Sequence, residues 1–357
     1  MQLQNKFINR LLFIRLLKNH FPTPSRNLPS RPAAITLALS LLALTSCSGG
    51  IPPESSFEYA VQGLYSAELS DDGSRAIVGS INHGGSLWQV SEKERQFNWN
   101  HKQGTYSQII SSAFSPDLGF AITATPQTMV LWDANSGEGI SYWTAPSEIL
   151  DINLLPQGEL ALLGMVDHSA ALFDVRNGGV RQVFYHDGRV NAVAIDSAHG
   201  RVLTGSDDYS ARLWDLQSAK ELQRWEHEDE VQLVELSPDG RVAFTMAKYD
   251  KAALWDTETG ASKGEIPLFS TAIARGLVYT AVAFSDDANY LLTGTSNRIV
   301  QLWDTRNLKE IKKWIMPKRN AVAPTSAAVQ ALAFAGGSNS SGNYYAITSD
   351  GFTHRLR

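Results

Sequence analysis

The segment Ser210–Asp215 (SARLWD) is the clearest copy of the short pattern that decides the fold. It places Leu213 before Trp214, and Asp215 follows the tryptophan. Six such leucine-aromatic pairs occur, with their aromatic residues 44, 41, 41, 41 and 48 positions apart, and five of them continue with aspartate. A pattern that returns at a nearly constant interval of this size indicates a repeat architecture. The aromatic markers and their aspartates are Trp88, Trp132, Asp133, Phe173, Asp174, Trp214, Asp215, Trp255, Asp256, Trp303 and Asp304.

Other positions of the repeat are also constant in character. Turn sequences such as Pro238-Asp239-Gly240 precede the marker, and residues of this kind connect short strands. The fourth repeat contains four short apolar runs, Val190–Ile195, Arg201–Thr204, Ser210–Trp214 and Glu221–Trp225, so we predict four strands per repeat. Eleven residues after the marker stands another large apolar residue: Trp99, Trp143, Phe184, Trp225, Ile266 or Trp314.

Four strands in about 40 to 45 residues, ending in Trp-Asp, resemble the WD-repeat family of β-propellers. The resemblance covers residues 57–357 and implies an all-β fold, a seven-bladed β-propeller of four-stranded antiparallel blades. The last repeat supplies three strands and stops at Phe352–Arg357. Residues 57–62 (FEYAVQ) resemble the missing fourth strand. We therefore expect this N-terminal strand to complete the last blade, which would cover two open sheet edges.

The resemblance also gives a structural role to four polar residues of the fourth repeat. His186, Thr204, Asp208 and Trp214 match the positions at which the family links an indole, a hydroxyl, a histidine and an aspartate by hydrogen bonds. A hydroxyl, a histidine and an aspartate also form hydrolase triads, but no Gly-x-Ser-x-Gly motif accompanies them here. We expect a network that satisfies buried polar groups, and no catalytic residues.

This set of four is incomplete in the other repeats. Its histidine returns only near His101 and His227. The position of the aspartate is occupied by Asn82, Gln127, Asp167, Tyr249, Asn297 and Gly351. The remaining histidines are His83, His168, His199 and His354. They are scattered without the spacing of a metal site, so we expect neither a metal nor another cofactor.

The first 46 residues have the features of an export signal. They include six basic residues and no acidic one, and Ala33–Leu44 (AAITLALSLLAL) is an uncharged segment too short to span a bilayer. Leu44-Thr45-Ser46-Cys47 resembles the bacterial lipobox, whose cysteine receives diacylglycerol. The resemblance implies a signal peptide over residues 1–46 and a lipid bilayer as the partner of an acylated Cys47.

Three further expectations concern this region. Ser48 after the cysteine is similar to the pattern that sorts lipoproteins to the outer membrane, so we expect the bacterial cell envelope, with the protein facing the periplasm. Residues 47–56 are rich in glycine, proline and serine, which predicts a flexible tether. The stretch before the apolar segment is long for a signal, and a start codon downstream of Met1 would explain its length.

Charge and cysteine content exclude several classes of function. Beyond residue 46 the chain has 25 basic and 36 acidic residues, a net charge of −11, and such a surface repels nucleic acid. Cys47 is the single cysteine, so a disulfide framework and a structural thiolate site are excluded. We expect a monomer.

Partner binding is expected in the longest connections between repeats. Residues 268–277 and 317–328 are additional to the repeat, and such insertions commonly lie on one binding face. An acidic group, Glu226, Glu228, Asp229 and Glu230, follows the fourth marker as a weaker candidate. Near the second insertion lies a basic group that we predict to bind a partner: Arg306, Lys312, Lys313, Lys318 and Arg319.

These observations predict a scaffold for protein-protein interactions that is anchored in the cell envelope and is not an enzyme. Its partner would be an envelope protein or peptide. One alternative is an envelope enzyme or carbohydrate binder that uses the central channel, where Glu68 and Glu235 are expected. Another is an accessory protein of outer-membrane assembly. A fold alone does not decide among these functions.

Overall fold

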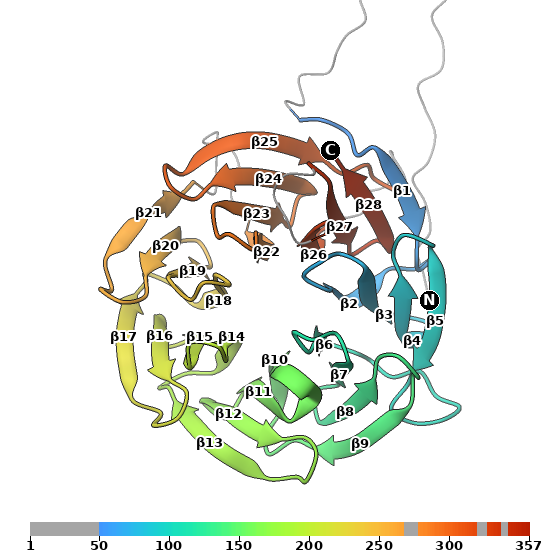
Figure 1. Ribbon diagram of the computed structural model, residues 1–357, viewed down its shortest axis with the longest axis horizontal. Helices are drawn as coiled ribbons and strands as arrows, with labels where there is room; N and C mark the ends of the chain where they lie inside the picture. Colours follow the sequence, from blue (N-terminus) through green and yellow to red (C-terminus); the bar gives the residue numbers. More distant parts are fainter. Residues whose placement is uncertain (1–49, 268–277, 320–326, 337–341) are drawn as a thin grey trace, which may run out of the picture. The chain divides into compact units, whose positions relative to one another are not determined.

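The computed structural model describes residues 50–267, 278–319, 327–336 and 342–357. The chain divides into two units, residues 1–47 and 48–357, and all of the described structure belongs to the second. Seven four-stranded antiparallel sheets surround a central axis in this unit (Figure 1). The predicted all-β, seven-bladed propeller is therefore confirmed.

Each blade runs from an innermost strand at the axis to an outermost strand at the rim. A 3-10 turn, η1 (Pro156–Gly158), lies between the first two strands of blade 3. Blade 1 contains β2 (Leu64–Leu69), β3 (Arg75–Ser80), β4 (Gly84–Gln89) and β5 (Glu94–Trp99), and blade 2 contains β6 (Ser111–Phe114), β7 (Phe120–Ala124), β8 (Thr128–Asp133) and β9 (Gly139–Thr144). Blade 3 contains β10 (Ile149–Leu154), β11 (Leu160–Met165), β12 (Ser169–Asp174) and β13 (Val180–Tyr185). Blade 4 contains β14 (Val190–Asp196), β15 (Arg201–Ser206), β16 (Ser210–Asp215) and β17 (Glu221–Glu226). Blade 5 contains β18 (Val231–Leu236), β19 (Val242–Ala247), β20 (Ala252–Asp256) and β21 (Ser262–Ile266). Blade 6 contains β22 (Tyr279–Phe284), β23 (Tyr290–Thr295), β24 (Ile299–Asp304) and β25 (Lys309–Ile315). Blade 7 contains β26 (Val329–Phe334), β27 (Tyr344–Thr348), β28 (Phe352–Leu356) and β1 (Ser55–Glu58).

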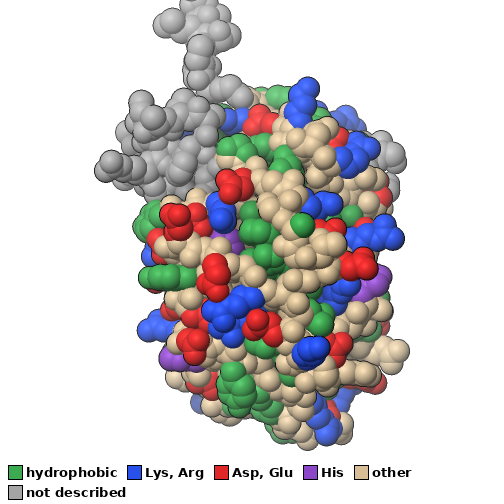
Figure 2. Space-filling view, turned by 90° about the vertical axis from the view of Figure 1, so that its left-hand side faces the viewer, with side chains coloured by type: hydrophobic (Ala, Val, Ile, Leu, Met, Phe, Trp, Pro, Cys, Tyr) green, Lys and Arg blue, Asp and Glu red, His purple; other side chains and the backbone are tan. Residues whose placement is uncertain are grey.

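Burial follows position within a blade. In blade 4 the central strands β15 and β16 are almost wholly buried, since neighbouring blades cover both of their faces. The outermost strand β17 is mostly exposed and fully buries only Trp225, because only one of its faces meets the core. On the side of the rim that Figure 2 shows, charged side chains of both signs are mixed with scattered apolar ones.

The large apolar residue eleven positions after each marker joins neighbouring blades. Trp99 of blade 1 stacks on Trp132 of blade 2 with ring centroids 5.4 Å apart, and its indole donates to the carbonyl of Gly137. Trp225 of blade 4 stacks in the same way on Trp255 of blade 5 at 5.5 Å. The repeat therefore specifies the contact between blades as well as the blade itself.

The ring closes through its N-terminal strand, as predicted, although the strand differs in its bounds. β1 covers Ser55–Glu58 rather than residues 57–62, and it pairs with β28 from Ser55 opposite Arg355 to Glu58 opposite Phe352. Pairing ends there because the amides of Tyr59 and Ala60 both donate to the carbonyl of Gly351 and turn the chain inward. Phe57 and Tyr59 then contact Trp88 at 6.4 and 4.5 Å, and so supply the joint between blades 7 and 1.

The residues just before β1 also contact the sheets. The Ile51 amide donates to the Lys313 carbonyl and the Ile51 carbonyl accepts from Ile315, so that residue 51 pairs with β25. The Glu54 carboxylate forms ion pairs with Arg355 and Arg357. Ile51 and residues 54–56, which fall within the predicted flexible tether, are thus bonded to the edges of blades 6 and 7, because open strand edges there offer hydrogen-bond partners.

Candidate functional site

The four polar residues singled out in blade 4 lie in one hydrogen-bonded chain. The Trp214 indole donates to the Thr204 hydroxyl at 2.8 Å, and His186 Nε2 lies 2.7 Å from the same hydroxyl. His186 Nδ1 lies 2.8 Å from Asp208 Oδ2. Thr204 is fully buried and His186 is 6% exposed, so the hydroxyl has no path to a substrate. These residues have the composition of a hydrolase triad but the position of a structural network.

The carboxylate at the end of this chain is held ionised. Burial alone would raise the pKa of Asp208, but hydrogen bonds from His186 and Ser210 outweigh it and hold that pKa far below its usual range. Arg212 Nη2 adds an ion pair at 2.8 Å. A buried charge is tolerated here because its oxygens are paired from several directions.

Blades 2 and 5 contain partial versions of the network. In blade 2, His101 Nε2 lies 2.9 Å from the Thr123 hydroxyl, which also accepts from the Trp132 indole at 2.8 Å. Thr128 occupies the far side of the histidine, with its hydroxyl 2.8 Å from Nδ1, in place of an aspartate. Burial lowers the pKa of His101 to about 4, so the ring is neutral at physiological pH.

In blade 5 the sequence analysis placed Tyr249 at the position of the aspartate. The structure instead brings Asp250 to the histidine, with its Oδ2 3.3 Å from His227 Nδ1. The reason is local, since Tyr249 has a left-handed backbone (φ 67°) and the altered turn carries the next residue toward His227. Counting from the marker could not show this shift of one residue.

His354, which the sequence analysis regarded as scattered, takes part in ring closure. Its Nδ1 lies 2.7 Å from the hydroxyl of Ser56 on β1, and its Nε2 lies 3.0 Å from the hydroxyl of Thr348 on β27. The side chain is almost fully buried, and this burial lowers its pKa to about 4. The Thr348 contact lies within the β27–β28 hairpin, but the pairing of β1 with β28 is what brings Ser56 to the histidine, so the spacing along the chain gave no signal of that contact.

The marker aspartates cap the turns that follow them. Asp133 accepts hydrogen bonds from the amides of Asn135 and Ser136, and Asp256 accepts them from Glu258 and Thr259. These amide hydrogen bonds are the main cause of the lowered pKa of Asp133 and of Asp256. The Trp-Asp pair therefore anchors the third strand from the inside through its indole and from its end through its carboxylate.

The predicted basic group does not form one cluster. Arg306 precedes β25 and pairs with Asp304 at 2.6 Å, whereas Lys318 and Arg319 follow the strand at its other end. Lys312 lies over the Trp314 ring at 5.4 Å, and Lys313 lies on the other side of the strand.

Arg319 is held in a structural role. Its guanidinium donates to the carbonyls of Ala60 and Asp350 at 2.8 and 2.6 Å and pairs with Glu58 at 2.5 Å. It thereby joins β1 to the last hairpin. Residues 268–277 and most of the second insertion, together with Cys47, lie outside the described residues.

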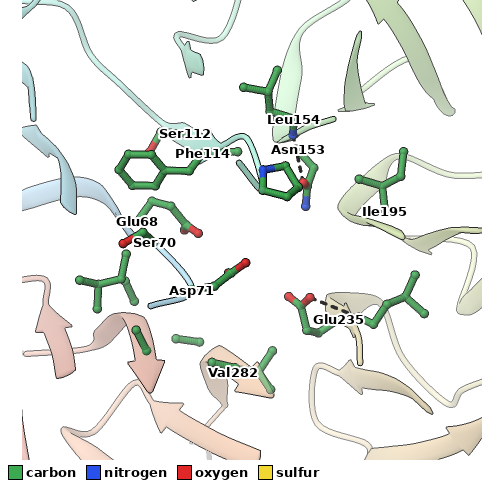
Figure 3. Close-up of a pocket in the computed structure, with 18 of the residues that line it drawn as sticks. Glu68, Ser70, Asp71, Ser112, Phe114, Asn153, Leu154, Ile195, Glu235 and Val282 are labelled. Atoms are coloured by element: carbon green, nitrogen blue, oxygen red, sulfur yellow. Dashed lines mark hydrogen bonds between the residues drawn. The ribbon is translucent and has the colours of Figure 1, made fainter. Parts of the chain in front are cut away.

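The central channel contains a cavity of about 640 Å³ (Figure 3). Glu68 and Glu235, the carboxylates expected there, line it from β2 and β18. Among the described residues that line it no lysine, arginine or histidine occurs. The other lining carboxylates, which sequence reasoning did not assign, are Asp71, Asp151, Asp196 and Asp286.

Burial without a counter-charge raises the pKa of several of these carboxyls. It is the main cause for Glu235, whose pKa rises to about 8, and the charge of Asp71 adds to the effect. The pKa of Glu68 is raised well above its usual value for the same reasons. Asp151 rises only to about 6, because the Val193 amide and the Ser111 hydroxyl donate hydrogen bonds to it. The channel therefore holds protons near neutral pH.

Two features are absent from the described residues. Within the described ranges no group of three or more His, Cys, Asp or Glu side chains is arranged to hold a metal ion. No helix in the described part of the chain has the length and apolar character needed to cross a membrane.

Comparison with known proteins agrees with this architecture. The family model for the WD domain, G-beta repeat, matches residues 179–215 and 275–304. The U5 small nuclear ribonucleoprotein 40 kDa protein of Dictyostelium discoideum is 27% identical over 146 residues, which is 40% of this chain and 40% of that relative. The match thus spans well under two thirds of the relative. Two of its repeats thus match the WD-domain model, and the described part of this chain as a whole is a seven-bladed β-propeller of the kind that such repeats build.

Proposed function

We propose that the protein is a platform for protein-protein interactions and has no catalytic activity of its own. The observation that carries this proposal is the burial of the triad-like residues, since Thr204 and His186 lie within hydrogen-bond distance of each other inside the blade and are closed to a substrate. WD-repeat propellers are typically scaffolds of this kind. A rigid closed ring with many loops presents binding side chains at little cost in conformational entropy.

The test is capture of partners from the native cells. The tagged full-length protein, cross-linked in place, is expected to retain specific proteins that a tag-only control does not. Turnover of a small substrate by the purified protein, without any captured partner, would refute the platform.

We further propose that the platform is a lipoprotein of the bacterial cell envelope, held in the outer membrane through Cys47. This proposal is supported by the sequence Leu44-Thr45-Ser46-Cys47 after a short apolar segment. The relative named above is a ribonucleoprotein component of a eukaryote, and the net charge of −11 beyond residue 46 argues against direct RNA binding by this chain.

The anchor is tested by metabolic labelling with a fatty-acid analogue in the native cells. The wild-type protein is expected to take up the label and to fractionate with outer membranes, whereas Cys47→Ser is expected to do neither. Label in the Cys47→Ser variant, or an unlabelled wild-type protein, would contradict it.

A further inference from the structure

Two exposed tyrosines occupy hairpins of neighbouring blades. Tyr209 lies between β15 and β16, and Tyr249 lies between β19 and β20; they are 48% and 68% exposed. Both have a left-handed backbone, with φ of 68° and 67°, which large side chains rarely adopt. Left-handed residues in other hairpins, such as Ala219 and Leu308, pack against the core, whereas these two rings remain at the surface.

An acidic loop connects the two hairpins. The amide of His227 donates to the Tyr209 carbonyl at 2.8 Å, which fixes one end of the loop. The amide of Glu228 donates to Asp250 Oδ2 at 3.0 Å, and the amide of Lys248 donates to the Glu230 carbonyl at 2.8 Å. The loop is thus held between the two tyrosine hairpins. We call the resulting surface the tyrosine-acid sector: Tyr209, Glu226, Glu228, Asp229, Glu230 and Tyr249.

The sector has more negative than positive charge. Arg224 pairs with Glu226 at 2.5 Å, and Lys248 lies 3.7 Å from Glu230. Glu228 and Asp229 have no ion-pair partner among the described residues. The side chain of Glu228 is exposed. Glu228 and Asp229 therefore lie without a counter-charge near two exposed rings, of which that of Tyr249 already has Lys248 Nζ 5.5 Å from its centroid.

On the basis of the platform function proposed above, we propose that the tyrosine-acid sector binds a segment of a partner protein rich in arginine or lysine. Tyrosine rings attract guanidinium and ammonium groups through their faces. Carboxylates accept charge-assisted hydrogen bonds from the same groups. Tyrosine is also favoured at binding surfaces because its rigid ring loses little entropy on contact. An acidic segment would meet more negative than positive charge in this sector.

The first test uses the purified full-length protein and two labelled peptides. In one peptide arginines alternate with glycine-serine spacers, and in the other glutamates replace the arginines. Fluorescence anisotropy is expected to show salt-dependent binding of the arginine peptide alone. Tyr249→Ala, and the double variant Glu228→Gln with Asp229→Asn, are each expected to weaken binding by about fivefold or more.

Tyr106→Ala provides the matched control, because Tyr106 is also 68% exposed but lies between β5 and β6 on another part of the ring. It should leave the affinity unchanged, and thermal melting should show that all variants are folded. Equal binding of the two peptides, unchanged affinity of Tyr249→Ala, or an equal loss in Tyr106→Ala would each overturn the proposal.

Partner capture separates this inference from the platform function. If the wild-type protein captures partners and the sector variants capture them equally well, the proposed binding role of the tyrosine-acid sector is refuted and the platform function is retained. If the wild-type protein captures nothing beyond the tag-only control, the platform itself fails. Loss of the captured partners in the sector variants alone supports both.

Discussion

The Thr204 hydroxyl is the single atom on which the blade 4 network depends. It accepts from the Trp214 indole and lies within hydrogen-bond distance of His186, so its removal leaves two buried polar groups unpaired. Thr293 in blade 6 provides a comparison, because its hydroxyl accepts from the Trp303 indole and blade 6 has no equivalent histidine.

We expect Thr204→Val to lower the free energy of unfolding by about 2 to 4 kcal/mol, and Thr293→Val by about 1 to 2 kcal/mol. Urea denaturation followed by circular dichroism measures both values. Equal losses in the two variants would show that the histidine and Asp208 add nothing to the network.

The exposed tyrosine in the hairpin of blade 4 offers a test of backbone strain. Tyr209→Asn is expected to raise the free energy of unfolding by about 0.5 to 1 kcal/mol, because asparagine tolerates the left-handed conformation better than tyrosine. Tyr106→Asn, at a position of ordinary backbone conformation, should give no such gain. A loss of stability in Tyr209→Asn would mean that its ring makes contacts that offset the strain.

The sequence predicts the blade 4 network but not its relatives in other blades. Its four members lie at the positions relative to Trp214 that the family resemblance assigns to them, so they can be named without coordinates. Asp250 is displaced by one residue through the backbone of Tyr249, and His354 meets Ser56 only after the ends of the chain pair. Offsets along the chain detect neither a local change of turn nor a contact between distant segments.

The innermost strands place carboxyl groups around a channel that contains no basic side chain among its described lining residues. The pKa of Glu235 is raised from 4.5 to about 8. The folded state therefore keeps a proton that the unfolded chain loses above pH 4.5. The stabilisation is complete below that pH and is lost as the pH rises through 8.

We expect wild-type protein to lose more stability than Glu235→Gln between pH 5 and pH 9, because the amide cannot ionise. Chemical denaturation across this range gives the difference between the two proteins at each pH. Glu228→Gln, at an exposed carboxylate, is the control and should follow the wild type. Parallel curves for wild type and Glu235→Gln would show that Glu235 is already ionised in the fold.

At the scale of strands the sequence is a good guide. The four apolar runs of the fourth repeat correspond to β14–β17 within two residues at each end, because turn residues and alternation mark both limits. The residues that line the channel are harder to predict from the sequence. Every innermost strand except β6 has a register irregularity near its start, which changes the residues that face the axis, and Asp151 lies next to one of them.

The whole ring depends on one pair of strands, β1 and β28. A chain that begins at Gly50 keeps β1, whereas a chain that begins at Val61 lacks it and exposes the edge of β28. We expect the first to be a folded monomer and the second to form aggregates and to melt at a lower temperature. Size-exclusion chromatography with light scattering distinguishes these outcomes, and equal behaviour of the two chains would contradict closure by this strand.

The blade number and the mode of closure could be predicted because the repeat is countable and its last copy lacks a strand. The bounds of β1 could not, since they depend on where Tyr59 and Ala60 turn away toward Gly351. The insertions where we expected partners lie outside the described residues, so the candidate sites rest on hairpins such as that of Tyr209.

Closure through the two ends of the chain also sets an order of events during synthesis. Arg355 is made 300 residues after its partner Ser55. At about 5 to 20 residues per second, the ribosome takes roughly 15 to 60 seconds to cover that distance. For this whole period the nascent chain presents an unmatched segment carrying Phe57 and Tyr59. The ring cannot be completed until translation has passed Arg355.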